Sequence, residues 1–204
     1  MALTLTTPNT ILGVLEPKSQ ALRLASNVVT VLLGTLLITL AAKVNVPTWP
    51  VPVTLQSFAI AAIAAAFGAR IGTATVVAYL LEGAAGLPVF ATGGGIAYLV
   101  GPTGGFLIGF IALAFIVGRA ADLGASGKVG ALFASMLIGA GVMFSFGFIW
   151  LLVLGSGAAW IDQSNVVASA FAKAVQPFLV WDAIKMLFAA LTVTGIWTLA
   201  KKRA

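Results

Sequence analysis

Residues 129–154 read VGALFASMLIGAGVMFSFGFIWLLVL, a run without a single charged side chain. A helix of this kind in a soluble protein would expose apolar side chains to water on at least one face. A helix of about 20 mostly apolar residues, in contrast, matches the hydrocarbon thickness of a bilayer. The stretch therefore predicts a transmembrane helix from Val129 to Leu154.

The composition of the whole chain agrees with this interpretation. Of the 204 residues, 61% are hydrophobic and only 8% are charged. An ordinary soluble domain carries roughly 25% charged residues, because its surface faces water. The composition therefore predicts an integral membrane protein.

The same reasoning predicts an all-α fold, a bundle of six transmembrane helices. The expected spans are Leu22–Ala42, Thr54–Phe67, Thr73–Ala85, Pro102–Val117, Val129–Leu154 and Pro177–Ala200. The second and third are short, so they are tilted, packed inside the bundle or only partly crossing, and a count that merges or drops one stays open. Residues 1–20 lack the features of a signal peptide and are expected to form an interfacial segment, followed by a single membrane domain at 21–204.

Lysine and arginine in the short loops indicate the orientation, because cytoplasmic loops carry an excess of both. With the N-terminus inside, only Lys43 and Lys173 lie outside. The cytoplasmic basic residues are then Lys18, Arg23, Arg70, Arg119, Lys128, Lys201, Lys202 and Arg203. Both termini are therefore predicted to be cytoplasmic. The outer connections, 43–53, 86–101 and 155–176, are the longer ones, which favours function on the outer side.

Several classes of function are excluded by what the sequence lacks. It has no cysteine and no histidine, which removes thiol nucleophiles, Cys/His metal sites and imidazole bases. The net charge of +6 comes from scattered basic residues that read as topology signals, not as a nucleic-acid surface. We therefore predict no enzyme, no catalytic residue, no metal, no cofactor and no nucleic-acid partner.

The most informative polar residues lie in the last predicted span. Asp182 and Lys185 are three residues apart and so occupy one helix face. Each charge inside a membrane costs on the order of 2.5–3.5 kcal/mol on insertion scales, so we expect the pair to have a structural or functional role. It is either an internal ion pair or a site for a small ligand that has both N–H and carbonyl groups. We favour the ligand site.

Other candidates lie in and beside the first two outer loops. Trp49 can cap a pocket or belong to an interfacial aromatic belt, and Gln56 can bind a ligand or join two helices. Thr92 and Tyr98 are candidate pocket residues, and Glu82 more often reaches interfacial water from such a position.

Small residues recur at helical spacing in two predicted spans. Gly101, Gly105 and Gly109 favour close helix packing, whereas Ala21 and Ala25 form a small-xxx-small pair for a partner helix in this chain or in another subunit.

Four motifs together resemble the BioY family, the biotin-specific substrate-binding subunits (S components) of energy-coupling-factor (ECF) transporters. They are PVPVTLQ at 50–56, GLPVFA at 86–91, GPTGGF at 101–106 and PFL-x-x-D-x-x-K at 177–185. They extend from the first outer loop to the last helix, so the resemblance covers nearly the whole membrane domain.

The resemblance implies a six-helix subunit of a prokaryotic plasma (inner) membrane that binds biotin from outside and hydrolyses nothing itself. Its implied partners are the lipid bilayer, a transmembrane coupling protein, on which Ala21 and Ala25 are expected to pack, and two ABC-type ATPases. Asp182 and Lys185 are implied to contact the ureido ring of biotin.

The chemistry of biotin fits these residues. The ureido ring offers two N–H donors for Asp182 and a carbonyl for Lys185, while the thiophane ring and valeryl chain suit an apolar pocket. Trp49, Phe90 and Tyr98 are candidates for that pocket. The partner of the biotin carboxylate stays open between Lys43, Lys173 and backbone N–H groups.

Two alternatives remain at this point. One is an S component for another vitamin, such as thiamine or riboflavin. The other is a structural membrane subunit without a ligand, for which neutralising Asp182 together with Lys185 would leave function intact.

Overall fold

The structure is a computed structural model that describes residues 9–11 and 19–203. Its described part is helical apart from one pair of two-residue strands. Five helical segments in it are long and apolar enough to cross a membrane. They are α2 (Gln20–Lys43), α3 (Gln56–Ala84), α5 (Gly104–Asp122), α6 (Val129–Gly155) and a last segment containing α7 (Val166–Ala174) and α8 (Leu179–Arg203).

Helix α3 contains most of the second and third predicted spans, although Thr54 belongs to a strand, and the helix reverses direction between them. Gly68 has φ 85° and ψ 175°, a conformation that only glycine adopts readily. The Gln56 Nε2 atom lies 2.8 Å from the Tyr79 hydroxyl, 23 residues along the chain. In a straight helix these residues would be about 34 Å apart. The two halves of α3 therefore pack against each other, and the expected interruption at 68–72 is a single glycine.

Other boundaries also differ from those expected, two of them near the last span. The predicted outer loop at 155–176 contains the helix α7, and α8 begins at Leu179 and not at Pro177. Residues 175–178 form a turn, in which the Phe178 N–H donates to the Val175 carbonyl at 3.0 Å. The first helical turn is closed by the Asp182 N–H, which donates to the Phe178 carbonyl at 2.7 Å. Asp182 thus lies in the first turn of α8.

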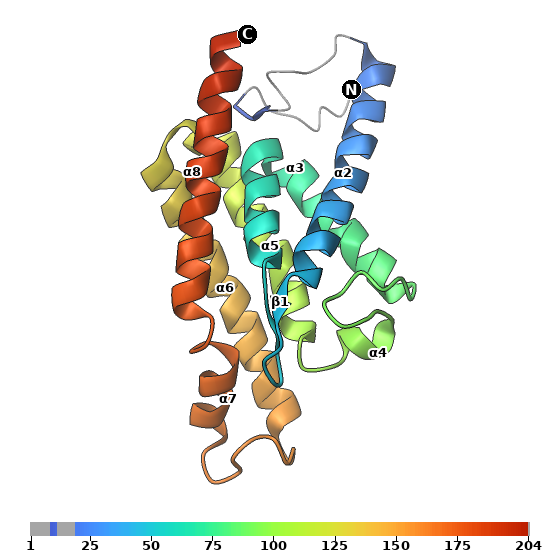
Figure 1. The fold of residues 1–204 in the computed structure, drawn as a ribbon, viewed down its shortest axis with the longest axis vertical. Helices are drawn as coiled ribbons and strands as arrows, with labels where there is room; N and C mark the ends of the chain where they lie inside the picture. Colours follow the sequence, from blue (N-terminus) through green and yellow to red (C-terminus); the bar gives the residue numbers. More distant parts are fainter. Residues whose placement is uncertain (1–8, 12–18, 204) are drawn as a thin grey trace.

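The helices run so that the start of α2 and the end of α8 lie at one end of the bundle, whereas the long connections lie at the other (Figure 1). α2 begins and α8 ends at the first end, which also contains the short 3-10 helix η1 (Ala125–Gly127). The opposite end contains the antiparallel strands β1 (Asn45–Val46) and β2 (Val53–Thr54), the short helix α4 (Ile96–Leu99) and α7. We call this second end the loop end.

Small residues let the central helices approach closely. A Cβ on Gly105 would overlap the Trp150 side chain, and a Cβ on Gly109 would lie 2.9 Å from the Met143 Cα, both on α6. The predicted packing role of these two glycines in α5 is confirmed. The outer faces of α2, α6 and α8, in contrast, expose large aliphatic side chains, as lipid-facing helices do. The core therefore lies around α3 and α5.

Candidate functional site

A cavity lies at the loop end, between β2, the start of α3, the 86–103 connection and the first turns of α5 and α8. It contains about 490 Å³ of empty space, including the part open to solvent. Small-molecule sites commonly combine apolar walls with a few polar groups. Its polar wall is made by Thr54, Gln56, Ser57, Asp182 and Lys185, and its apolar wall includes Phe90, Tyr98, Phe106, Phe110, Met143, Phe144 and Phe178.

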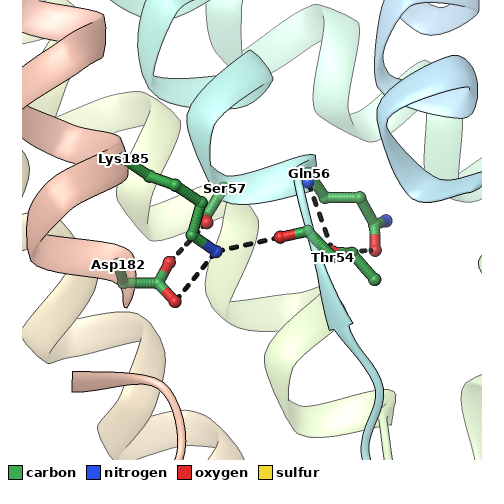
Figure 2. A network of polar contacts seen from close by, with 5 residues as sticks. All are labelled: Thr54, Gln56, Ser57, Asp182 and Lys185. Atoms are coloured by element: carbon green, nitrogen blue, oxygen red, sulfur yellow. Dashed lines mark hydrogen bonds and ion pairs between the residues drawn. The ribbon is translucent and has the colours of Figure 1, made fainter. Parts of the chain in front are cut away.

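Asp182 is the buried charge of the cavity wall, with 2% of its surface exposed. Its position in the first turn of α8 suits a carboxylate, because the N-terminal end of a helix carries partial positive charge. The Ser57 hydroxyl donates a short hydrogen bond to Asp182 Oδ1. The Lys185 Nζ lies 3.0 Å from Asp182 Oδ2 (Figure 2).

Lys185 connects the same carboxylate to the first outer loop. Its ammonium also donates to the Thr54 carbonyl at 2.9 Å, at the end of β2 (Figure 2). The Lys185 side chain is 12% exposed and the Asp182 side chain 3%. The pair therefore holds α8 against β2 and the start of α3, in surroundings where an unpaired charge would be strongly unfavourable.

A second polar network begins at Gln56. Its side-chain oxygen accepts from the Thr54 hydroxyl at 2.9 Å, and its amide donates to the Tyr79 hydroxyl at 2.8 Å. Tyr79 in turn donates to the Val89 carbonyl at 3.0 Å. Gln56 thus joins the two halves of α3, as one of its two sequence interpretations expected, and it also lines the cavity.

This network places Phe90 in the cavity wall. The Phe90 ring is fully buried, meets Tyr79 edge-on at 5.4 Å and stacks on Tyr98 at 5.0 Å between ring centroids. A Cβ on Gly83 would overlap the Phe90 ring, so a glycine at this position lets the ring lie against α3. The motif GLPVFA therefore positions an aromatic wall.

Of the residues expected to bind substrate, Gln56, Phe90, Tyr98, Asp182 and Lys185 all line the cavity. Trp49 and Thr92 do not: the Trp49 side chain is 72% exposed, and Thr92 is exposed as well. A contact between either side chain and a ligand in this cavity would require its loop to change position. Glu82 is half-buried and does not line the cavity.

Lys43 and Lys173 were the two lysines that the sequence analysis considered as partners of the biotin carboxylate. Neither lines the cavity directly. The Lys43 Nζ, however, donates to the carbonyl of Phe90 at 2.5 Å, and so lies behind a residue that does. Lys173 lies in the last turn of α7.

Ala21 and Ala25, the expected partner-packing pair, are both exposed on α2. Further along this helix, a Cβ on Gly34 would lie 2.6 Å from the Thr75 Cγ2 of α3. The start of α2 therefore presents its small residues to the outside, and its middle packs inside the chain.

Sequence reasoning missed Ser57, the Thr54 carbonyl and four phenylalanines of the cavity wall. Ser57 follows Gln56 directly, and a second polar residue beginning an apolar span was a usable signal. The ring contacts of Phe178 with Phe106 and Phe144, at 5.8 and 6.1 Å, join three separate helical regions. No local pattern distinguishes these rings from the other phenylalanines of the chain.

The buried pair yields a prediction about stability without any ligand. Asp182→Leu should destabilise the protein by about 3–5 kcal/mol, because it leaves the Lys185 ammonium buried without its counter-charge. The double variant Asp182→Leu/Lys185→Met should recover most of this loss, since no uncompensated charge remains. Denaturant unfolding of the detergent-purified variants measures both. A double variant as unstable as the single one would contradict the interpretation.

Comparison with known proteins places these features in a family. Residues 15–202 match the BioY family. A protein of Thermotoga maritima described as "Biotin transporter BioY" is 37% identical over 170 residues, which cover 83% of this chain and 94% of that protein. A "Probable biotin transporter BioY" of Pyrococcus horikoshii is 36% identical over 162 residues, 79% of this chain and 90% of that protein.

The fold has a relative among solved structures. A crystal structure of "the S-component for biotin from an ECF-type ABC transporter" superposes with a TM-score of 0.69 over 84% of this chain and 90% of that one, at 23% identity. That likeness shows the fold, and the sequence matches show the family. The four motifs had predicted the same relationship, which is confirmed: the chain belongs to the BioY family.

Proposed function

We propose that this chain captures biotin in the loop-end cavity and delivers it as the substrate-binding subunit of an ECF-type transporter. The observation that carries the proposal is the buried Asp182–Lys185 pair in the wall of an otherwise aromatic cavity. The relatives described as biotin transporters support the choice of ligand. The protein is then a transporter subunit, not an enzyme.

The polar groups of the cavity retain hydrogen-bonding capacity for a ureido ring. An ionised carboxylate has about four acceptor positions, and Asp182 uses one for Ser57 and one for Lys185. An ammonium has three donors, of which Lys185 uses one for Asp182 and one for the Thr54 carbonyl. The remaining acceptor positions of Asp182 match the two ureido N–H groups, and the remaining donor of Lys185 matches the ureido carbonyl. The existing bonds hold the two charges in place before the ligand binds.

The apolar wall suits the rest of the molecule. Phe90, Tyr98 and Phe178 belong to ring clusters that surround the cavity, and the valeryl chain and thiophane ring of biotin need contact area but few polar partners. Since aromatic rings clustered in this way are already fixed by packing, little side-chain entropy is lost on binding.

We further propose that the chain crosses a prokaryotic plasma membrane six times, with both ends cytoplasmic. The reversal of α3 at Gly68 supports two crossings by that element. The distribution of charge supports the orientation. Arg119 lies in the last turn of α5 and Lys128 directly after η1, and Arg70 follows the reversal at Gly68, where a Cβ would meet Asp122. Lys43, at the end of α2, and Lys173, in α7, belong to the loop end. The cavity then faces outward.

Among the predictions about function, the first concerns biotin itself. Titration of detergent-purified protein with labelled biotin should show one-to-one binding. Asp182→Asn and Lys185→Ala should each weaken it by tenfold or more, about 1.4 kcal/mol at least. Phe115→Leu, on a half-exposed position of α5 outside the cavity, is the matched control and should bind as the wild type does.

Three outcomes are informative. Absence of binding to folded wild-type protein would rule out biotin and lead to titration with thiamine and riboflavin. Binding that survives both substitutions would make Asp182 and Lys185 a structural pair. Weakening confined to the two cavity variants supports the proposal.

The second prediction concerns the carboxylate of biotin, for which we propose Lys43. Lys43→Met should lower the affinity for biotin by about tenfold, because one charge-assisted hydrogen bond is lost. Biotinamide, which has no carboxylate, should bind Lys43→Met and wild type alike. Lys173→Met is the control. Equal loss for biotin and biotinamide would show that Lys43 acts through the Phe90 carbonyl and not on the ligand.

The third prediction concerns assembly. We propose that the exposed Ala21 and Ala25 pack on a transmembrane coupling protein that binds two ABC-type ATPases. Ala21→Leu/Ala25→Leu should abolish co-purification with those subunits but leave biotin binding unchanged, since the pair is far from the cavity along α2. Val28→Leu, at a 51% exposed position of the same helix, is the control. Retained co-purification of the double variant would reject this surface.

A further inference from the structure

A second pocket lies at the end of the bundle opposite the cavity. It is formed by the turn that contains η1, the first residue before α6 and the last two turns of α8. Its empty volume is about 910 Å³, including open solvent. The lining residues are Asn9, Gly124, Gly127, Lys128, Trp197, Thr198, Lys201 and Lys202. We call it the basic pocket.

Three ammonium groups converge on this pocket from two separate parts of the chain. Lys128 precedes α6, while Lys201 and Lys202 lie at the end of α8, and all three are exposed. None of them pairs with a carboxylate among residues 9–11 and 19–203. The nearest acidic residue of the turn, Asp122, is already used: it accepts from the Ala69 N–H at 3.3 Å and lies 4.0 Å from Arg119. The pocket therefore has a net positive charge.

An indole completes the pocket. Trp197 is half-buried, and it packs so closely on the turn that a Cβ on Gly127 would lie 3.0 Å from its Nε1. Within the described residues the indole N–H donates to no acceptor. The turn itself is fixed, because the Ser126 hydroxyl donates to the Ala65 carbonyl of α3 at 3.0 Å. The pocket thus combines a rigid floor, an unused N–H donor and three cations.

Exposed apolar side chains flank the same pocket. Leu123, in the turn, is 77% exposed, and Leu199, on the last turns of α8, is 62% exposed. Such side chains are suited to lipid tails, whereas lysines and tryptophan at a membrane boundary are suited to headgroups. A ligand with a phosphate and two acyl chains would use both parts.

We propose that the basic pocket binds the headgroup of an anionic phospholipid, with the phosphate between Lys128 and the lysines of α8. Basic pockets between transmembrane helices are a recurring site for such headgroups. The simpler alternative is that the lysines only mark topology and remain in water. Arg119, in the last turn of α5, and Arg70, two residues after the reversal at Gly68, belong to the same end of the bundle but do not line the pocket, so they separate the two explanations. The inference does not depend on which ligand occupies the cavity at the loop end.

The experiment is native mass spectrometry of the full-length protein in detergent, titrated separately with phosphatidylglycerol, phosphatidylcholine and inorganic phosphate. Wild type should bind one phosphatidylglycerol at least tenfold more tightly than phosphatidylcholine. Lys128→Gln/Lys201→Gln should lower the affinity for phosphatidylglycerol by tenfold or more, since each lysine contributes a factor of about five to that affinity. The matched control Arg70→Gln/Arg119→Gln removes the same charge from the same end, and should change the affinity less than about twofold.

The outcomes separate the alternatives. Equal weakening by both double variants would overturn the proposal in favour of a general charge effect. The absence of a preference for phosphatidylglycerol would also overturn it, and inorganic phosphate bound without any lipid preference would make this a site for a free anion. Thermal unfolding of each variant in detergent checks that exposed lysines were replaced without loss of the fold.

Discussion

The buried ion pair between Asp182 and Lys185 is the constraint around which the loop end is built. Two charges in a membrane protein's interior need partners, and these come from outside α8: the Ser57 hydroxyl and the Thr54 carbonyl. α8 is therefore held against β2 and the start of α3, although these segments are separated by 125 residues or more in sequence. The cavity lies beside this contact, and its polar wall is the contact itself.

The remaining wall follows from a second set of dependencies. The reversal of α3 at Gly68 brings Tyr79 back to Gln56, and the Tyr79 hydroxyl then holds the Val89 carbonyl. That bond places the neighbouring Phe90 over the cavity. Polar and apolar walls are thus fixed by different networks, which meet at Thr54 and Gln56. Such a site is organised before a ligand arrives, which favours tight binding of a small, rigid molecule.

The sequence predicted the elements that local chemistry determines. Apolar length predicted the long helices, and the spacing of Asp182 and Lys185 predicted their shared face. It did not predict that Ser57 and the Thr54 carbonyl complete the pair, because that contact depends on how α8 meets β2 in three dimensions. The sequence did predict an interruption at 68–72, between the second and third spans, but not which residue makes the reversal: Gly68 is one of 23 glycines, and it shares a positive φ with several others. Trp49 was a candidate for the apolar pocket, yet it is 72% exposed in the structure.

The central claim is that Lys185 binds the ureido carbonyl of biotin and Asp182 binds the two ureido N–H groups. The most direct test compares the Kd of biotin with that of 2-iminobiotin, in which a protonated imine replaces the carbonyl, for wild type and Lys185→Met. Wild type should prefer biotin by more than about tenfold, because the cation meets the Lys185 ammonium. In Lys185→Met the preference should vanish or reverse, since the cation then lies near Asp182 alone. An unchanged preference in Lys185→Met would contradict the account.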